Sequence, residues 1–267
     1  MTKRARLALG VCRMLYRFVI GLSMKVLFRN PPDRYVAESQ ASSSFWTIWF
    51  PTFVFIAIPL VAYAYTPFFM KWFASERQGV LEFLHFFLPL LTGLIGLRLA
   101  FCDVAKSDPL LRFWCFAMFL GGVYLAGEEA SWGQHYLGWV TPEGWATLND
   151  QKETNLHNVS NLLDQLPRGI LMAGIVVTGI IYPWILVHKP GLLPARFDFT
   201  YPPIALRWLA ILIAFGWVYR ALKKHTGLSE YLVYRPGEFQ EIFIVWFLFY
   251  YALFLLWRAR SVETVAG

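Results

Sequence analysis

Residues 46–65 read WTIWFPTFVFIAIPLVAYAY, twenty residues in a row without one charged side chain. A helix of roughly 20 apolar residues is long enough to cross the hydrocarbon core of a lipid bilayer. This stretch therefore predicts a transmembrane helix, and it sets the class of fold for the rest of the chain.

Comparable apolar runs recur along the 267 residues, of which 57% are hydrophobic and only 15% charged. Mean hydropathy is positive, at +0.47. We expect an all-α fold, a polytopic bundle of about six transmembrane helices that forms a single membrane domain over residues 1–267. Its expected parts are a cytoplasmic amphipathic segment at 1–44, the bundle at 45–257 and a cytoplasmic tail at 258–267. The predicted spans are 46–65, 80–102, 109–127, 168–188, 203–222 and 238–257.

Basic residues predict the orientation of these spans. Eight Lys and Arg side chains precede the first span, against only Asp33 and Glu38. Because cytoplasmic segments are enriched in Lys and Arg, the N-terminus is expected in the cytoplasm of an inner membrane, and six crossings return the C-terminus there. The basic loop at 220–235 departs from this pattern. Topology thus accounts for the net charge of +7, and a nucleic-acid partner is not expected.

Residues 6–28, RLALGVCRMLYRFVIGLSMKVLF, combine basic and apolar side chains. They are expected to form a basic amphipathic helix that lies on the cytoplasmic leaflet, where anionic headgroups attract Lys and Arg. The alternative is a helix packed against a partner subunit.

Ionisable side chains gather at the ends of the spans, and the predicted topology places them on one face, the periplasmic one. Carboxylates close to hydrocarbon are costly unless they meet water, a partner or a cation. Acids that begin a helix are favoured by its dipole, whereas acids that end one are not. The pair at the end of the third span is therefore the clearest sign of a specific site. The residues concerned are Glu82, Glu128, Glu129, Glu153, His157, Glu238 and Glu241.

The segment at about 128–160 is expected to form an interfacial or re-entrant cap, because Trp132, Trp139 and Trp145 suit the headgroup level of a membrane. Glu153 and His157 are four residues apart and would share one face of a helix. Carboxylates and imidazoles can hold a divalent metal ion, with Glu129, Glu153, His157 and Glu241 as its expected ligands. The expected catalytic residues are Glu128, Glu129, Glu153 and His157. The competing interpretation is that these acids are merely solvated at span ends.

Two smaller features lie in the cap and in the spans beside it. Ser131 is a weak candidate nucleophile with His135 or His157 as its base, because no glycine elbow flanks it. Four glycines in the second and third spans are expected to permit close helix packing rather than ligand binding. They are Gly93, Gly96, Gly121 and Gly122.

The run GEEASWGQHYLGWVTPEGWATLNDQKETNLHN, at 127–158, resembles a motif of an uncharacterised family of bacterial polytopic membrane proteins. The family pattern reads Glu-Glu-x-Ser-Trp-Gly-Gln, then Thr-Pro-Glu, then Asn-x-Gln-x-Glu-x-x-x-His-Asn. The chain departs from it at His135, where the family often has Arg, and His85 is not part of it. The resemblance implies no established activity. It singles out Glu82, Glu128, Glu129, Trp132, Gln134, Glu153, His157 and Asn158. Glu238 is a further supporting residue, not because of the resemblance but because it lies at the end of a span.

Three functions remain open from the sequence. The first is an enzyme that acts on a lipid or lipid-linked substrate, by metal- or acid/base-assisted hydrolysis or transfer, with membrane lipids as its partners. The second is a non-catalytic subunit of a larger membrane complex, with partner membrane subunits; the 18% aromatic content fits both. The third is a cation transporter or channel, against which the lack of an internal repeat counts.

Overall fold

The computed structural model describes residues 45–73, 75, 79–149, 151–189, 192, 197–226 and 236–266. Within these ranges every regular element is a helix. Six helical segments are long and apolar enough to cross a membrane, which confirms the predicted all-α bundle of six spans. The predicted amphipathic helix in 1–44 lies outside the described residues. The candidate spans are Phe45–Ala62, Val80–Ala100, Pro109–Glu129, Gln165–Leu186, Ile204–Leu222 and Gln240–Ser261.

Some spans are continuous helices and others combine several turns of different pitch. The second, third and sixth spans are α6 (Val80–Ala100), α8 (Pro109–Glu129) and α14 (Pro236–Ala266). The first joins η1 (Phe45–Trp49) to α4 (Phe50–Ala64), and the fifth joins η6 (Ile204–Leu206) to α13 (Arg207–Thr226). The fourth runs through α11 (Asn161–Val176), the π-helical turn η3 (Val177–Ile181) and α12 (Tyr182–His188). Short helices between spans are α5 (Thr66–Trp72), α7 (Asp103–Ser107), η2 (Ser131–Gly133), α9 (Gln134–Leu137) and α10 (Glu143–Ala146).

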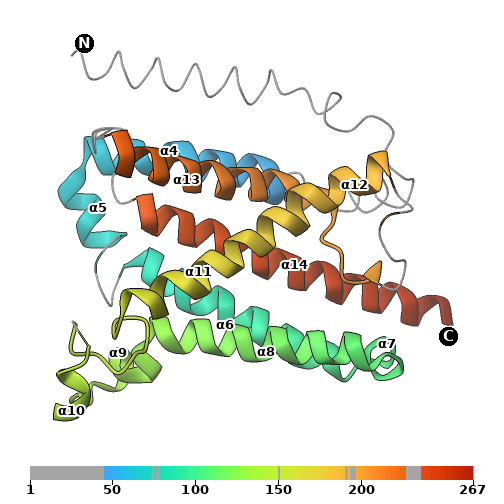
Figure 1. Ribbon diagram of the computed structural model, residues 1–267, viewed down its shortest axis with the longest axis horizontal. Coiled ribbons are helices and arrows are strands. Elements are labelled where there is room, and N and C mark those ends of the chain that lie inside the picture. Colours follow the sequence, from blue (N-terminus) through green and yellow to red (C-terminus); the bar gives the residue numbers. More distant parts are fainter. Residues whose placement is uncertain are drawn as a thin grey trace.

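The sixth span forms the centre of the bundle. In α14, 61% of the candidate span is buried, against 39% or less for each of the others. The helix packs against α6 and α13 (Figure 1). Its apolar side chains belong to the main core cluster. It also continues as a helix to Ala266, through the segment predicted as a tail.

Glycines bring α6 and α8 into backbone contact, as the sequence predicted. A Cβ atom on Gly122 would lie 2.5 Å from the carbonyl oxygen of Pro89 and 2.6 Å from the nitrogen of Gly93. A Cβ atom on Gly96 would lie 2.9 Å from the carbonyl oxygen of Cys115. Gly121 differs, because a Cβ atom there would meet nothing within 4 Å. Only glycine lets the two helices approach this closely, which sets the relative position of the side chains they carry.

The predicted cap follows α8 at one end of the bundle. Figure 1 shows α9 and α10 together at that end, near the start of α11 and on the side away from the C-terminus. The elements that begin or end there include α6, α8 and α14. These three helices carry all the acids singled out from the sequence except Glu153, which lies in the cap.

Candidate functional site

Adjacent glutamates at the end of α8 point to different neighbours. Successive residues of an α-helix are rotated by about 100°, so Glu128 and Glu129 cannot face the same group. Glu128 is buried and binds the cap, whereas Glu129 lies with His85 and Glu241 of the bundle. The acidic pair therefore takes part in two separate clusters.

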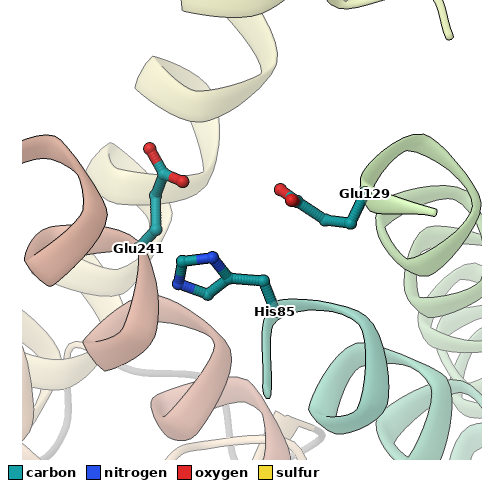
Figure 2. A group of neighbouring side chains, drawn as sticks. All are labelled: His85, Glu129 and Glu241. Carbon is teal, nitrogen blue, oxygen red and sulfur yellow. The ribbon is translucent and has the colours of Figure 1, made fainter. Parts of the chain in front are cut away.

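The bundle cluster joins one imidazole and two carboxylates from three spans. His85 lies in the second turn of α6, Glu129 is the last residue of α8, and Glu241 lies in the second turn of α14. One ligand atom from each lies within 4.8 Å of the others, and His85 is only 1% exposed. Figure 2 shows the three side chains directed toward a common space between their helices. We call His85, Glu129 and Glu241 the metal group.

These donors fit a divalent cation. Imidazole suits first-row transition metals such as Zn²⁺ and Fe²⁺, and carboxylates add Mn²⁺ to that range. Bonds of about 2.0–2.2 Å place two ligand atoms on one ion at most about 4.4 Å apart. The 4.8 Å limit found here requires only a small inward movement of side chains to reach that spacing. The three residues leave further coordination positions for water or a substrate.

Basic and amide side chains hold the Glu241 end of α14. Arg168 of α11 forms a 2.7 Å ion pair with Glu241 Oε1. Beside it, the buried Gln240 accepts a hydrogen bond from Arg220 at 3.1 Å and donates to the sulfur of Met172 at 2.9 Å. Partners of this kind orient metal ligands in proteins, so Arg168 is placed to fix the direction of the Glu241 carboxylate.

The second cluster, which we call the cap network, centres on two buried carboxylates. Glu128 Oε2 accepts from the backbone N–H groups of Leu156 and His157, at 2.7 and 2.8 Å. Its Oε1 accepts from the indole of Trp132 at 2.8 Å, and His157 Nδ1 lies 3.3 Å from Oε2. A carboxylate at the C-terminal end of α8 is thus stabilised by donors from the cap, which explains its unusual place.

Glu153 is the other buried carboxylate of the cap network. Its Oε2 accepts from Ser131 at 2.8 Å and from Asn155 at 3.0 Å, and its Oε1 lies 3.0 Å from His135 Nε2. Asn149 holds the backbone of this segment in place, because its Oδ1 accepts a hydrogen bond from the backbone N–H of Glu153 at 3.1 Å. The stretch 151–160 is not helical. Glu153 and His157 therefore do not share a helix face, contrary to the sequence-based expectation.

A sharp reversal of the backbone allows this network to form. Ser131 and Trp132 have φ of 45° and 55°, and Gly133 has φ of 103°. Such conformations cost of order 1–3 kcal/mol each for residues other than glycine and persist only where surrounding contacts fix them. Here the Trp132 ring packs on Gly127, where a Cβ atom would lie 2.9 Å from it. The reversal turns the chain back toward the bundle.

Ser131, His135 and Glu153 do not form a nucleophilic triad. In such a triad the serine and the acid bind different nitrogens of the imidazole. Here Nε2 of His135 lies 3.0 Å from Ser131 Oγ and 3.0 Å from Glu153 Oε1, and Ser131 donates to Glu153 directly. Ser131 is also fully buried. These contacts position His135 rather than activate Ser131.

A small cavity connects the two clusters. It has a volume of about 120 Å³, and its lining includes Glu82, Glu129, His135 and Tyr136. Glu129 belongs to the metal group and His135 to the cap network, so one residue of each cluster lines this cavity. Partial burial, followed by the negative charge of Glu82, raises the pKa of Tyr136 above its usual value. The phenol is therefore a neutral hydrogen-bond donor at this wall.

The predicted site residues are distributed as follows. Of the four predicted metal ligands, Glu129 and Glu241 meet in the metal group, whereas Glu153 and His157 bind within the cap network. Gln134 holds the cap by accepting from the backbone N–H of Thr154 at 2.9 Å. Asn158 donates to Gln151 at 2.8 Å. Glu238 lies in the first turn of α14, but its side chain falls outside the described residues.

Sequence reasoning gave too little weight to His85 and His135. His85 was visible as a partner three residues after Glu82, on the same helix. The family pattern does not include His85 and often has Arg at the position of His135, so the resemblance points to neither histidine as a metal ligand. The signal that identifies them is spatial, since each lies beside a predicted acid from a different element.

Comparisons with protein-family models, with curated proteins and with solved structures find no match to this chain.

Proposed function

We propose that the chain is a membrane enzyme that acts on a lipid or lipid-linked substrate by metal-assisted hydrolysis or transfer. The observation that carries the proposal is the metal group, one imidazole and two carboxylates brought within 4.8 Å from three different spans. A divalent cation bound there would lower the pKa of a bound water and polarise a substrate oxygen. The shared cavity gives that substrate a place beside Glu129.

His135 is the proposed acid/base residue of this reaction. With Glu153 ionised, its carboxylate only accepts hydrogen bonds, and the 3.0 Å contact then places the proton on Nε2 of His135. None of the described residues hydrogen-bonds its Nδ1, and the ring lines the cavity that Glu129 also lines. A carboxylate that fixes the tautomer and direction of an imidazole is how proton-transfer histidines are held in enzymes. His135 therefore takes a proton from, or returns it to, a group bound in the cavity.

The position of the site favours an amphiphilic substrate. Within the described spans, every acidic residue lies among the first or last three residues of its span. A polar site at this level is reached by a lipid headgroup while the acyl chains stay in the hydrocarbon. The same distribution gives less support to a cation path through the bundle, which needs polar groups at mid-span.

We further propose that this end of the bundle faces the periplasm, with both termini in the cytoplasm of an inner membrane. The basic N-terminal segment supports that orientation. We also propose that the chain shares its cap with the family that its motif resembles, because Trp132 and His157 of that motif both contact Glu128.

Metal analysis of the detergent-purified protein tests the proposal. The protein is stripped with a chelator, incubated with Zn²⁺, Mn²⁺ or Fe²⁺ and freed of unbound ions, and its metal is then measured by mass spectrometry. We expect one ion per chain in the wild type and its loss in His85→Ala, Glu129→Gln and Glu241→Gln. Arg168→Gln, which removes an outer partner of the site, should weaken metal affinity by roughly 10–100-fold.

Two control variants separate this assignment from its alternatives. Glu143→Gln removes an exposed acid of the cap, and Glu153→Gln removes one of the two buried acids of the cap network. Both should keep the metal. If the wild type binds none of the three ions, or if the controls lose it as the metal-group variants do, the proposal is wrong. Conversion of an extracted lipid mixture by the metal-loaded wild type, but not by Glu129→Gln, would establish the enzymatic part.

A further inference from the structure

The most exposed apolar side chains of the cap lie in one short segment. Leu137 is 78% exposed and Val140 is 89% exposed, and they stand beside Tyr136 and Trp139, which are also exposed. We call Tyr136–Val140 the cap tip. It follows the end of the third candidate span, so its exposure is not explained by a place in a transmembrane helix. Apolar side chains gathered in this way mark a surface that contacts another apolar phase.

The cap tip is held rigidly from its polar side. Gln134 Nε2 donates to the carbonyl oxygen of Trp139 at 3.1 Å and to Thr141 Oγ1 at 2.8 Å. Thr141 in turn donates to the carbonyl oxygen of Lys152 at 2.6 Å. These bonds tie the C-terminal end of the cap tip to Gln134 and to the backbone of Lys152. The apolar side chains are therefore presented outward by a constrained loop.

Aromatic packing fixes the level of the cap tip relative to the spans. The rings of Tyr136 and Phe86 pack with their centroids 5.4 Å apart. Phe86 is the seventh residue of α6, which places it about 9 Å along the helix from its first residue at a rise of about 1.5 Å per residue. The Tyr136 end of the cap tip thus lies beside the first turns of the second candidate span.

The cap tip is continuous with a surface that faces lipid. Phe83 and Phe87 of α6 are exposed on the candidate span and stack on each other, with ring centroids 5.3 Å apart. Phe83 and Phe86 line the cavity together with Tyr136. The aromatic side chains of the span and of the cap tip therefore meet at the rim of this cavity, whose other walls carry Glu82, Glu129 and His135.

We propose that the cap tip inserts into the bilayer that the bundle crosses, at the boundary between headgroups and hydrocarbon. Leu137 and Val140 enter the apolar phase, while Tyr136 and Trp139 take the interfacial level that such rings prefer. Insertion sets the cavity wall at Tyr136 against the membrane, so a lipid headgroup reaches the cavity sideways. The insertion itself does not depend on metal binding or on the proposed reaction.

Spin labels report this insertion in the full chain. Cys12, Cys102 and Cys115 are replaced by alanine, and a single cysteine is placed at Val140 and labelled with a nitroxide. The protein is reconstituted into phosphatidylcholine–phosphatidylglycerol vesicles, and collision with oxygen and with a water-soluble nickel chelate is measured. We expect the label at Val140 to collide severalfold more with oxygen relative to nickel than a label at Glu143, an exposed polar position of the same cap.

A third label supplies the reference for full lipid contact. Leu120 is an exposed residue in the third candidate span, and Leu120→Cys should give the highest ratio of oxygen to nickel collision. If the label at Val140 resembles the one at Glu143, the cap tip lies in water and the proposal is wrong. Strong dipolar broadening between labels at Val140 would instead show a second copy of the chain against this surface, which also overturns the proposal.

Discussion

Replacement of Gly122 by alanine should separate two helices and weaken the metal group at a distance. A Cβ atom there would lie 2.5 Å from the Pro89 carbonyl oxygen, 2.6 Å from the Gly93 nitrogen and 2.7 Å from its Cα. All three atoms are backbone, so no side-chain rotation relieves the overlap. Because ordinary contact begins at 3.4 Å, α6 and α8 must move apart by about 0.9 Å.

The size of the effect follows from two opposing contributions. Overpacking costs roughly 1–3 kcal/mol, and the upper end applies where only backbone can yield. In the opposite direction, alanine stabilises a helix by about 1 kcal/mol relative to glycine. We therefore expect Gly122→Ala to lower the free energy of unfolding by about 2 kcal/mol, which corresponds to a fall in melting temperature of roughly 4–8 °C. Gly121→Ala keeps only the favourable contribution, since a Cβ atom there meets nothing within 4 Å.

Thermal unfolding in detergent micelles measures the pair of variants side by side. The same samples are then assayed for bound metal, because α6 carries His85 and α8 carries Glu129. Gly122→Ala should bind the ion more weakly than Gly121→Ala. Equal melting temperatures for the two variants would refute the close helix contact. A destabilised Gly122→Ala with unchanged metal affinity would show that the metal group does not depend on it.

Two further predictions concern the cap. Glu128→Gln removes a charged acceptor of three hydrogen bonds and should lower the free energy of unfolding by roughly 1.5–3 kcal/mol. The loss should be seen as faster amide exchange at Leu156 and His157. The exposed Glu143→Gln should stay within about 0.5 kcal/mol of wild type. Burial and Glu82 raise the pKa of Tyr136 above 10.0, so the folded state holds the phenolic proton more tightly than the unfolded state does. That stabilisation is complete below pH 10.0 and is lost as the pH rises through the raised pKa, so Tyr136→Phe should flatten the alkaline loss of stability measured by thermal unfolding. A steeper alkaline loss in that variant would contradict the assignment.

The class of fold could be predicted from the sequence because hydropathy is a local property that adds along the chain. Twenty uncharged residues at 46–65 have no stable place in lipid except as a helix, whatever the rest of the chain does. The predicted spans accordingly agree with the structure to within a few residues. Close packing at Gly93 and Gly122 was predictable for a similar reason, since small residues are what adjacent membrane helices need.

The membership of each cluster was decided only by the tertiary structure. Glu128 and Glu129 are neighbours in sequence, yet one binds the cap and the other joins the metal group. The spacing of Glu153 and His157 predicted a shared helix face, but residues 151–160 are not helical and Lys152, directly before Glu153, has φ of 57°. Sequence spacing gives the direction of a side chain only within one regular element. Which helices meet, and at what rotation, depends on packing across the whole bundle, and that packing is what brings His85 beside the acids.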